Sequence, residues 1–320
     1  MDKLSAMRTF SCVVEHGSFS RAADVLGIPK ARVSQRVADL EKVLGVRLLH
    51  RTTRAVSLTA DGLVYAEQCR QVLDSIEELE ARLAGGTSSP RGRLRVETQT
   101  AFSRWILSPK LIEFRDRYPQ IQVLLGAHHQ VRNLLEDGID CAIRGGPVDD
   151  SSLSALHVMD VHAGLYASPG YMQDFGPTAE PEMLERADLV GWFDPRTNTP
   201  RPWFLRSGAS AYDLKRPPRL LLDDPESAVA AATMGAGITP ASPFAVEHLV
   251  RQGRLVPVLP QWHLRPQPVH IVYPANRFLS ARVRAFVDWA FQMMSNDAKL
   301  HLRPHDLVVI SHAGAAASTP

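Results

Sequence analysis

Cationic, amide and hydroxyl side chains gather within residues 30–36, and their chemistry suits contacts with nucleic acid. They are Lys30, Arg32, Ser34, Gln35 and Arg36. Long cationic and amide side chains reach phosphates and base edges when the helix that carries them lies in a major groove. The alternative is a solvated surface, because many helices carry a cationic face that contacts only water. The elements around these residues decide between the two.

Two short helices joined by a tight turn would position these side chains. Ser18 can cap a helix over residues 19–26, and Gly27 can end it. Pro29 fits the start of a second helix, which we expect to run to about residue 44. Apolar residues recur along that helix at spacings of four, three and four, which predicts a buried stripe opposite the cationic face. The stripe consists of Val33, Val37, Leu40 and Leu44.

The charge of the chain is distributed unevenly. Residues 1–60 hold ten Lys and Arg against five Asp and Glu, a net charge of +5, whereas residues 61–320 carry a net charge of −3. The whole-chain value of +2 therefore hides a basic N-terminal module attached to a mildly acidic remainder. This pattern is expected when one end of a protein meets nucleic acid.

Three segments, SFSRAADVLGI, VSQRVADLEKVLGVRLLHRTTR and VSLTADG, resemble the N-terminal domain of LysR-type transcriptional regulators. The resemblance implies a supporting first helix over about residues 2–15 and a two-stranded wing over residues 47–58. It implies DNA contacts by Ser18, Lys30, Ala31, Arg32, Ser34, Gln35, Arg36, Arg51, Thr52, Thr53 and Arg54. The last four residues lie at the tip of the wing, where guanidinium groups can enter a minor groove or pair with phosphates.

The chain departs from the family pattern at three positions in or beside the second helix. The family often has Ser or Thr where this chain has Pro29, Pro or Ser where it has Ala31, and Arg or Lys where it has Gln35. Ser34 matches the pattern directly. We therefore expect Arg36 to take over the cationic role that Gln35 lacks, and an unusual operator preference.

Thr59 can cap a long helix with one apolar stripe. The stripe consists of Leu63, Ala66, Cys69, Leu73, Ile76, Leu79 or Glu80, and Leu83. Burial of the stripe in a dimer seam is one solution, and packing against the protein's own second domain is the other. The resemblance favours the seam, because LysR-type regulators dimerise through this helix and commonly form tetramers. The Gly, Ser and Pro residues within 85–90 predict a flexible hinge.

Beyond the hinge, strand and helix patterns alternate, which indicates an α/β fold with a largely parallel sheet. We expect strands over residues 93–97, 121–126, 141–144, 163–167, 189–193, 220–222, 237–239 and 269–274. We expect helices over residues 101–118, 131–137, 181–186, 225–234 and 281–294. The second run of elements repeats the first, which implies two lobes.

The resemblance extends over residues 1–296 and implies a two-lobed, doubly wound α/β effector domain behind an all-α type winged helix-turn-helix domain. The expected limits are 1–60 for the DNA-binding domain, 61–90 for linker helix and hinge, and 91–296 for the effector domain. Its first lobe would hold residues 91–160 and 268–296, and its second lobe residues 161–267. We expect the tail, 297–320, to be poorly ordered.

The family binds small effectors between the lobes, so the effector is expected there. The candidate contacts are Gln99, Thr100, Phe102, Arg144, Phe204, Ser227, Ile238 and Thr239. Each of them could equally serve packing or a turn. A small anionic metabolite, with or without an aromatic ring, is the expected co-inducer, and its identity is unknown. No other cofactor is expected.

Catalytic and metal-binding patterns are not found in the sequence. It holds no GxSxG elbow, no P-loop and no GxGxxG motif, and the paired histidines lack the further ligands that a metal site needs. We expect no catalytic residue, no metal, no membrane segment and a cytoplasmic location. The expected partners are promoter DNA, the effector, further copies of the chain and RNA polymerase. The alternative is a cytoplasmic small-molecule-binding or catalytic α/β protein whose basic module serves assembly.

Overall fold

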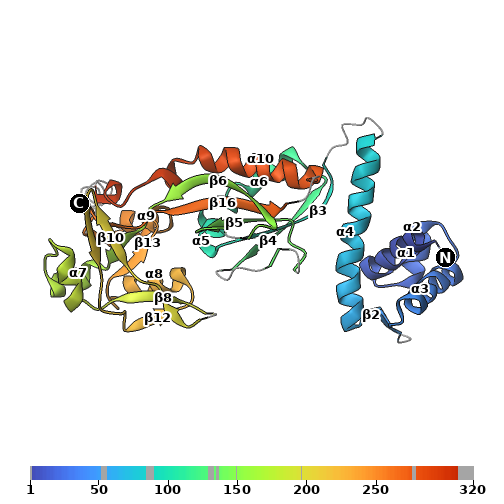
Figure 1. Ribbon diagram of the computed structural model, residues 1–320, viewed down its shortest axis with the longest axis horizontal. Helices are drawn as coiled ribbons and strands as arrows, with labels where there is room; N and C mark the ends of the chain where they lie inside the picture. Colours follow the sequence, from blue (N-terminus) through green and yellow to red (C-terminus); the bar gives the residue numbers. More distant parts are fainter. Residues whose placement is uncertain are drawn as a thin grey trace. The chain divides into compact units, whose positions relative to one another are not determined.

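The computed structural model describes residues 2–51, 56–83, 90–128, 133–134, 137–148, 150–195, 197–275 and 279–308 (Figure 1). The chain forms two units, Met1–Gly92 and Arg93–Pro320. Each unit has its own hydrophobic core.

Three helices begin the first unit: α1 (Lys3–His16), α2 (Phe19–Leu26) and α3 (Lys30–Leu44). The Ser18 hydroxyl accepts a hydrogen bond from the Arg21 N–H at 3.4 Å, as an N-cap does. Gly27 has φ of 62°, a left-handed conformation that ends α2 and costs glycine little. The predicted stripe is confirmed, because Val33, Val37 and Leu40 are fully buried against α1 and α2.

The expected wing is present as an antiparallel pair, β1 (Leu49–Arg51) and β2 (Val56–Leu58). Its tip residues Thr52, Thr53 and Arg54, like the side chain of Arg51, lie outside the described part of the chain. Helix α4 (Ala60–Leu83) follows. The Thr59 hydroxyl accepts from the Gly62 N–H at 2.9 Å and donates to the Arg47 carbonyl, so one side chain joins α4 to the wing.

The apolar stripe of α4 needs a correction. Cys69 and Leu73 are buried in the core of the first unit, with Ala66 packed beside them, so the stripe is partly used within the chain's own N-terminal unit. The physical reason is that α1 also offers an apolar face, which lies alongside α4. Among the described side chains of α4, Leu63 of the stripe is 64% exposed, and Val64 and Val72, which lie outside the stripe, are 66% and 46% exposed.

A five-stranded sheet of order β4-β3-β5-β16-β6 organises the first lobe of the second unit. Its strands are β3 (Gly92–Thr98), β4 (Ile121–Ala127), β5 (Cys141–Gly145), β6 (Leu153–Val161) and β16 (Gln267–Pro274). Strands β3 and β5 are parallel, with Thr98 opposite Ile143. Helices α6 (Leu111–Arg117) and α10 (Ala281–Ser295) pack against each other through Phe114 and Phe286, whose ring centroids are 5.4 Å apart.

The expected single helix over residues 101–118 is wrong. The segment is divided into α5 (Thr100–Phe102), the π-helical turn η1 (Ser103–Leu107) and α6. Pro109 has no N–H to donate to the carbonyl four residues earlier, so a regular helix cannot continue through it. The Ser108 N–H reaches back five residues to the Ser103 carbonyl at 2.9 Å. Most of the helix expected over residues 131–137 lies outside the described residues.

Three small sheets of three strands each form the second lobe, with orders β11-β10-β15, β12-β8-β9 and β13-β7-β14. The strands are β7 (Gly164–Ala167), β8 (Val190–Asp194), β9 (Thr199–Pro200), β10 (Phe204–Ser207), β11 (Ser210–Asp213), β12 (Leu220–Leu222), β13 (Thr239–Ala241), β14 (Val256–Val258) and β15 (His263–Leu264). The helices are α7 (Pro169–Phe175), η2 (Pro181–Arg186), α8 (Pro225–Thr233) and α9 (Pro243–Arg251).

We had expected a largely parallel sheet, and the first lobe differs from that expectation. Strand β16 runs antiparallel to both β5 and β6. Strand β6 carries the chain out of the first lobe and β16 brings it back, so the two lie side by side in opposite directions (Figure 1). No crossover helix is needed for such a pair.

We had expected the tail to be poorly ordered from Asp297 on, but its first part, to residue 308, is folded. Residues 298–301 form the short helix η3 (Ala298–His301), and Leu300 and Leu307 are 2% and 0% exposed. Leucines that find apolar partners leave water, which offsets the entropy lost when the segment becomes ordered. The rest of the tail, from residue 309 on, lies outside the described residues.

Candidate nucleic-acid interface and effector crevice

Helix α3 presents a solvent-exposed side opposite its buried stripe. At 3.6 residues per turn, Ala31, Gln35 and Lys42 share that side, and all three are exposed. Lys30 and Arg32 are exposed near the start of the same helix. This arrangement can present an amide and several cations to the edges and phosphates of a groove.

The two neighbours Gln35 and Arg36 have different surroundings. The Gln35 amide donates to the Asp39 carboxylate at 2.8 Å, one turn along the exposed side of α3. The partly buried Arg36 donates from Nη1 to the Thr9 hydroxyl of α1 at 3.4 Å. Thr9 is 1% exposed. The structure therefore places Gln35 near the centre of the exposed side and Arg36 at its border, beside α1, whereas the sequence had favoured Arg36.

The remaining predicted DNA contacts fall into two groups. Ser34 is partly buried beside the stripe, and Ser18 is partly buried with its hydroxyl engaged in the cap of α2. The wing tip lies outside the described residues, so the structure describes no geometry for Thr52, Thr53 or Arg54.

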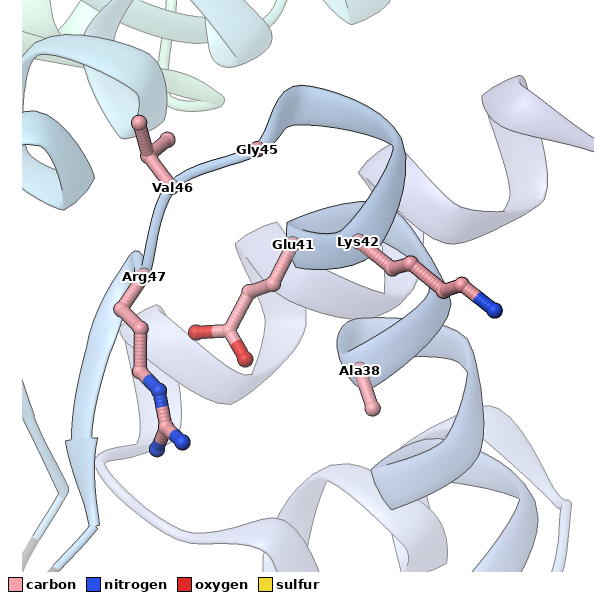
Figure 2. Close-up of a pocket in the computed structure, with 6 residues that line it drawn as sticks. All are labelled: Ala38, Glu41, Lys42, Gly45, Val46 and Arg47. Atoms are coloured by element: carbon pink, nitrogen blue, oxygen red, sulfur yellow. The ribbon is translucent and has the colours of Figure 1, made fainter.

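A shallow hollow of about 430 Å³ lies between the end of α3 and the start of the wing (Figure 2). Its lining includes the exposed cations Lys42 and Arg47, which sequence reasoning did not single out. Glu41 lies between them and accepts hydrogen bonds from the backbone N–H groups of Leu48 and Leu49 at 2.8 and 3.1 Å. This carboxylate holds the wing against α3, and the two cations beside it have the chemistry of phosphate contacts.

In the second unit, several predicted effector residues meet where β3 and β5 end. The Gln99 side-chain oxygen accepts from the Gly145 N–H at 3.1 Å, which joins the two strand ends. Phe102 is buried and stacks on Phe244 of α9, with centroids 5.3 Å apart. The carboxyl ends of parallel strands are where α/β proteins bind ligands.

Charged side chains are buried at the same edge. Arg144 of β5 is partly buried, and burial lowers its pKa, while the nearby carboxylates of Glu97 and Asp150 oppose that shift. Glu97 is 8% exposed and its carboxylate lies 3.6 Å from the His128 Nε2 atom. An arginine keeps its positive charge in spite of such a shift. The edge can therefore pair a guanidinium with a ligand anion.

The two lobes also meet through residues that the sequence did not indicate. The indole N–H of Trp105, in η1, donates to the Glu226 carboxylate of α8 at 3.2 Å, and Arg104 lies 3.6 Å from the same carboxylate. The Trp105 ring lies 4.2 Å from that of His248 in α9. Burial raises the pKa of Glu226, whereas Trp105 and Arg104 lower it. Trp105 and Glu226 are 121 residues apart along the chain, so no local pattern in the sequence indicated their contact.

The structure does not bring every predicted effector residue to this edge. Ser227 directly follows Glu226 in α8, and its hydroxyl and N–H both bond to the Asp224 carboxylate, at 2.9 and 3.0 Å. Phe204 is 45% exposed in the separate β11-β10-β15 sheet. Ile238 is fully buried in the second-lobe core, and Thr239 is fully buried in β13.

Both units match known families. Residues 4–63 match the bacterial regulatory helix-turn-helix protein of the lysR family, and residues 87–295 match the LysR substrate binding domain. The chain belongs to the LysR family. It is a LysR-type DNA-binding transcriptional regulator, and its α/β unit is a LysR substrate-binding domain.

Named regulators and solved structures resemble the chain over most of its length. The chain is 50% identical over 311 residues to the HTH-type transcriptional repressor PA14_22550 of Pseudomonas aeruginosa strain UCBPP-PA14, covering 97% of this chain and 98% of that one. The solved structure of CrgA from Neisseria meningitidis has a TM-score of 0.59 at 31% identity and covers 91% of this chain and 99% of its own. The full-length Vibrio cholerae virulence activator AphB has a TM-score of 0.56 at 26% identity, with 91% and 99% covered.

Among the described residues, no helix is both long and apolar enough to cross a membrane. In the same part of the chain, His, Cys, Asp and Glu side chains form no group of three or more that could hold a metal ion.

Proposed function

We propose that this LysR protein reads a specific operator through the exposed side of α3 and responds to a small anionic effector bound at the carboxyl ends of β3 and β5. Operator reading is supported by one observation: Gln35 lies on the exposed side of α3, between Lys30 and Lys42 along the helix. The buried stripe of α3 fixes this helix on the rest of the first unit. A helix held in this way can enter a major groove without rearrangement.

Base reading is assigned to Gln35, and positioning to the cations around it. A glutamine amide pairs with the N6 and N7 edge of adenine, whereas lysine and arginine side chains at phosphates fix register without reading sequence. The hydrogen bond from Gln35 to Asp39 limits the orientations of the amide before DNA arrives. The expected half-site therefore contains an adenine opposite Gln35.

A dimer would present two copies of α3 to half-sites about 34 Å apart, or a multiple of that distance. Val64 and Val72 are exposed and lie about 80° apart around α4, and the side of the helix that carries them is the proposed dimer seam. The family's oligomers support this assignment, and the tetramer is proposed as the assembly of two dimers.

A selection from random DNA tests the DNA-binding half. The full-length protein is expected to enrich a dyad with two related half-sites, and Gln35→Ala is expected to enrich a dyad with one relaxed position in each half. Gln122→Ala, which removes an exposed glutamine from β4 in the other unit, serves as the matched control. Enrichment of no common sequence by the parent protein would contradict the proposal.

The effector half is supported by the charge of Arg144 and by the amide of Gln99 at the end of the neighbouring strand. Partial burial strengthens the attraction between a guanidinium and a carboxylate, because less water screens it. A thermal-shift screen of aliphatic and aromatic carboxylates tests it. A hit is expected to lose its stabilising effect in Arg144→Gln and to keep it in Arg206→Gln, which changes an exposed arginine of β10. Equal loss in both variants, or none in either, would contradict this site.

Repression is the proposed sign of regulation, on the strength of the 50% identity to a named repressor over nearly the whole chain. A reporter placed behind the selected operator tests it. Expression of the protein is expected to lower reporter output, and an increase would assign activation instead.

A further inference from the structure

Residues 297–308, the C-terminal strap, are anchored on the first lobe at their beginning. The Asp297 carboxylate lies 2.9 Å from the Lys110 Nζ atom and is itself 8% exposed. Leu300 is 2% exposed and belongs to the core that contains Phe286 and Trp289 of α10, a core that Phe244 of α9 extends to the second lobe. An ion pair and a buried leucine thus fix the first turn of the strap.

The other end of the strap is anchored on the second lobe. Leu307 is fully buried in the cluster that contains Tyr166 and Leu249, with Leu302 packed against it. Pro304 lies on Gly164 so closely that a Cβ atom at position 164 would be 2.6 Å from the Pro304 Cβ atom. The glycine at the start of β7 leaves the space that the strap occupies.

Between its anchors the strap reaches the places where the chain crosses from lobe to lobe. One crossing joins β6, which ends at Val161, to β7, and the other joins β15, which ends at Leu264, to β16. The rings of His162 and His263, one at each crossing, are 5.1 Å apart. The strap residues Arg303 and His305 lie close enough to His162 to act on its charge. The strap therefore adds a third connection between the lobes at the hinge, a non-covalent one, beside the two covalent crossings.

We propose that the C-terminal strap fixes the angle between the two lobes and that an effector acts against this restraint. The proposal rests on the proposed function for the effector's role, but the restraint itself needs neither DNA nor effector. A segment anchored on both lobes favours the arrangement in which both anchors are seated. Any ligand that prefers another angle must then unseat one anchor, so the strap sets the range over which an effector can move the lobes.

Spin labels on the two lobes of the full-length protein test the restraint directly. Glu113→Cys in α6 and Asp174→Cys in α7 place labels at exposed positions, and Cys12, Cys69 and Cys141 are all buried. Labelled chains are diluted with unlabelled ones so that each measured distance lies within one chain. The parent is expected to give one narrow distance distribution.

Three variants release the strap in different ways: a chain ending at Asn296, Leu307→Ala, and Gly164→Ala, which leaves the strap sequence intact. Each is expected to broaden the distribution by about twofold or to shift it. Lys299→Ala, at an exposed position of the strap, is expected to match the parent. Near-ultraviolet circular dichroism identifies variants that remain folded. Parent-like distributions in the folded variants would overturn the proposal, whatever the protein does with DNA.

Discussion

Gln35 and Arg36 are neighbours in sequence, yet their side chains are held by different parts of the first unit. Gln35 bonds within α3, to Asp39, and stays exposed, whereas Arg36 bonds to Thr9 of α1. Gln35→Ala is expected to weaken binding to the selected operator by about 1 to 3 kcal/mol and to relax preference at one base of each half-site. Gel shifts on a set of base-substituted operators measure both effects.

Arg36→Ala is expected to behave differently, because its guanidinium lies beside α1. The variant should weaken binding by a similar factor on every sequence, as loss of a phosphate contact does, and should slightly lower the stability of the first unit. Loss of preference at a single base in Arg36→Ala, with none in Gln35→Ala, would reverse the two assignments.

The sequence predicted the residue types on the exposed side of α3 but not which of them lies at its centre. The stripe of Val33, Val37 and Leu40 indicated the buried side of α3, and the exposed side followed from it. The position of Arg36 depends on Thr9, which is distant in sequence and gives no local signal. Contacts between elements, such as that of Trp105 with Glu226, escaped prediction for the same reason.

His162, at the crossing between the lobes, makes the stability of the second unit depend on pH. Burial lowers its pKa from 6.5, and His263 and Arg303 lower it further, while Asp160 opposes them and His305 adds to the lowering. Because the folded chain disfavours the protonated ring, the unfolded chain binds more protons, and stability is lost as the pH falls below 6.5. The melting temperature of the second unit should therefore fall in acid, and less steeply in His162→Gln. The prediction would be contradicted if the melting temperature fell equally steeply with falling pH in parent and variant, from the same value at a pH of about 8.

At the scale of elements, the contact between α4 and the wing depends on one glycine. A Cβ atom at Gly62 would lie 1.9 Å from the Leu48 carbonyl oxygen, which belongs to the backbone and cannot move aside freely. Gly62→Ala is expected to lower the free energy of unfolding of the first unit by about 1 to 3 kcal/mol. Gly170→Ala is the control, because a Cβ atom there meets nothing within 4 Å. Equal melting temperatures for the two variants would contradict the prediction.

Adjacent residues of α4 separate folding from assembly. Leu73 is 7% exposed in the core of the first unit, whereas Val72 is 46% exposed on the proposed seam. Val72→Asp is expected to dissociate the dimer in sedimentation experiments and to leave the monomer folded. Leu73→Ala is expected to cost about 2 to 5 kcal/mol of stability through the cavity it leaves. A stable dimer of Val72→Asp would place the seam elsewhere.

Elements with clear periodicity and capping residues were predictable, and elements defined by tertiary contacts were not. Helix α2 matched its expected bounds because Ser18 and Gly27 mark both ends. Helix α9 was missed because its apolar residues are not confined to one side, and buried positions follow one another from Pro243 to Val246. Such a run does not distinguish helix from strand.

At the scale of the whole molecule, the order of the two units was predictable from charge and motif. The basic excess within residues 1–60 and the alternation of strands and helices beyond the hinge indicated a DNA-binding module followed by an α/β unit. The strap was not predictable, because the polar composition of the tail gave no sign of the apolar surfaces that receive Leu300 and Leu307.

Binding of the full-length protein to its selected operator and to a shuffled copy, measured over a range of salt concentrations, tests the central claim most directly. A sequence-specific regulator is expected to bind the operator about 10³-fold or more tightly than the shuffled copy, with affinity for both falling steeply as salt rises. Equal affinity for the two DNAs at every salt concentration would contradict the claim.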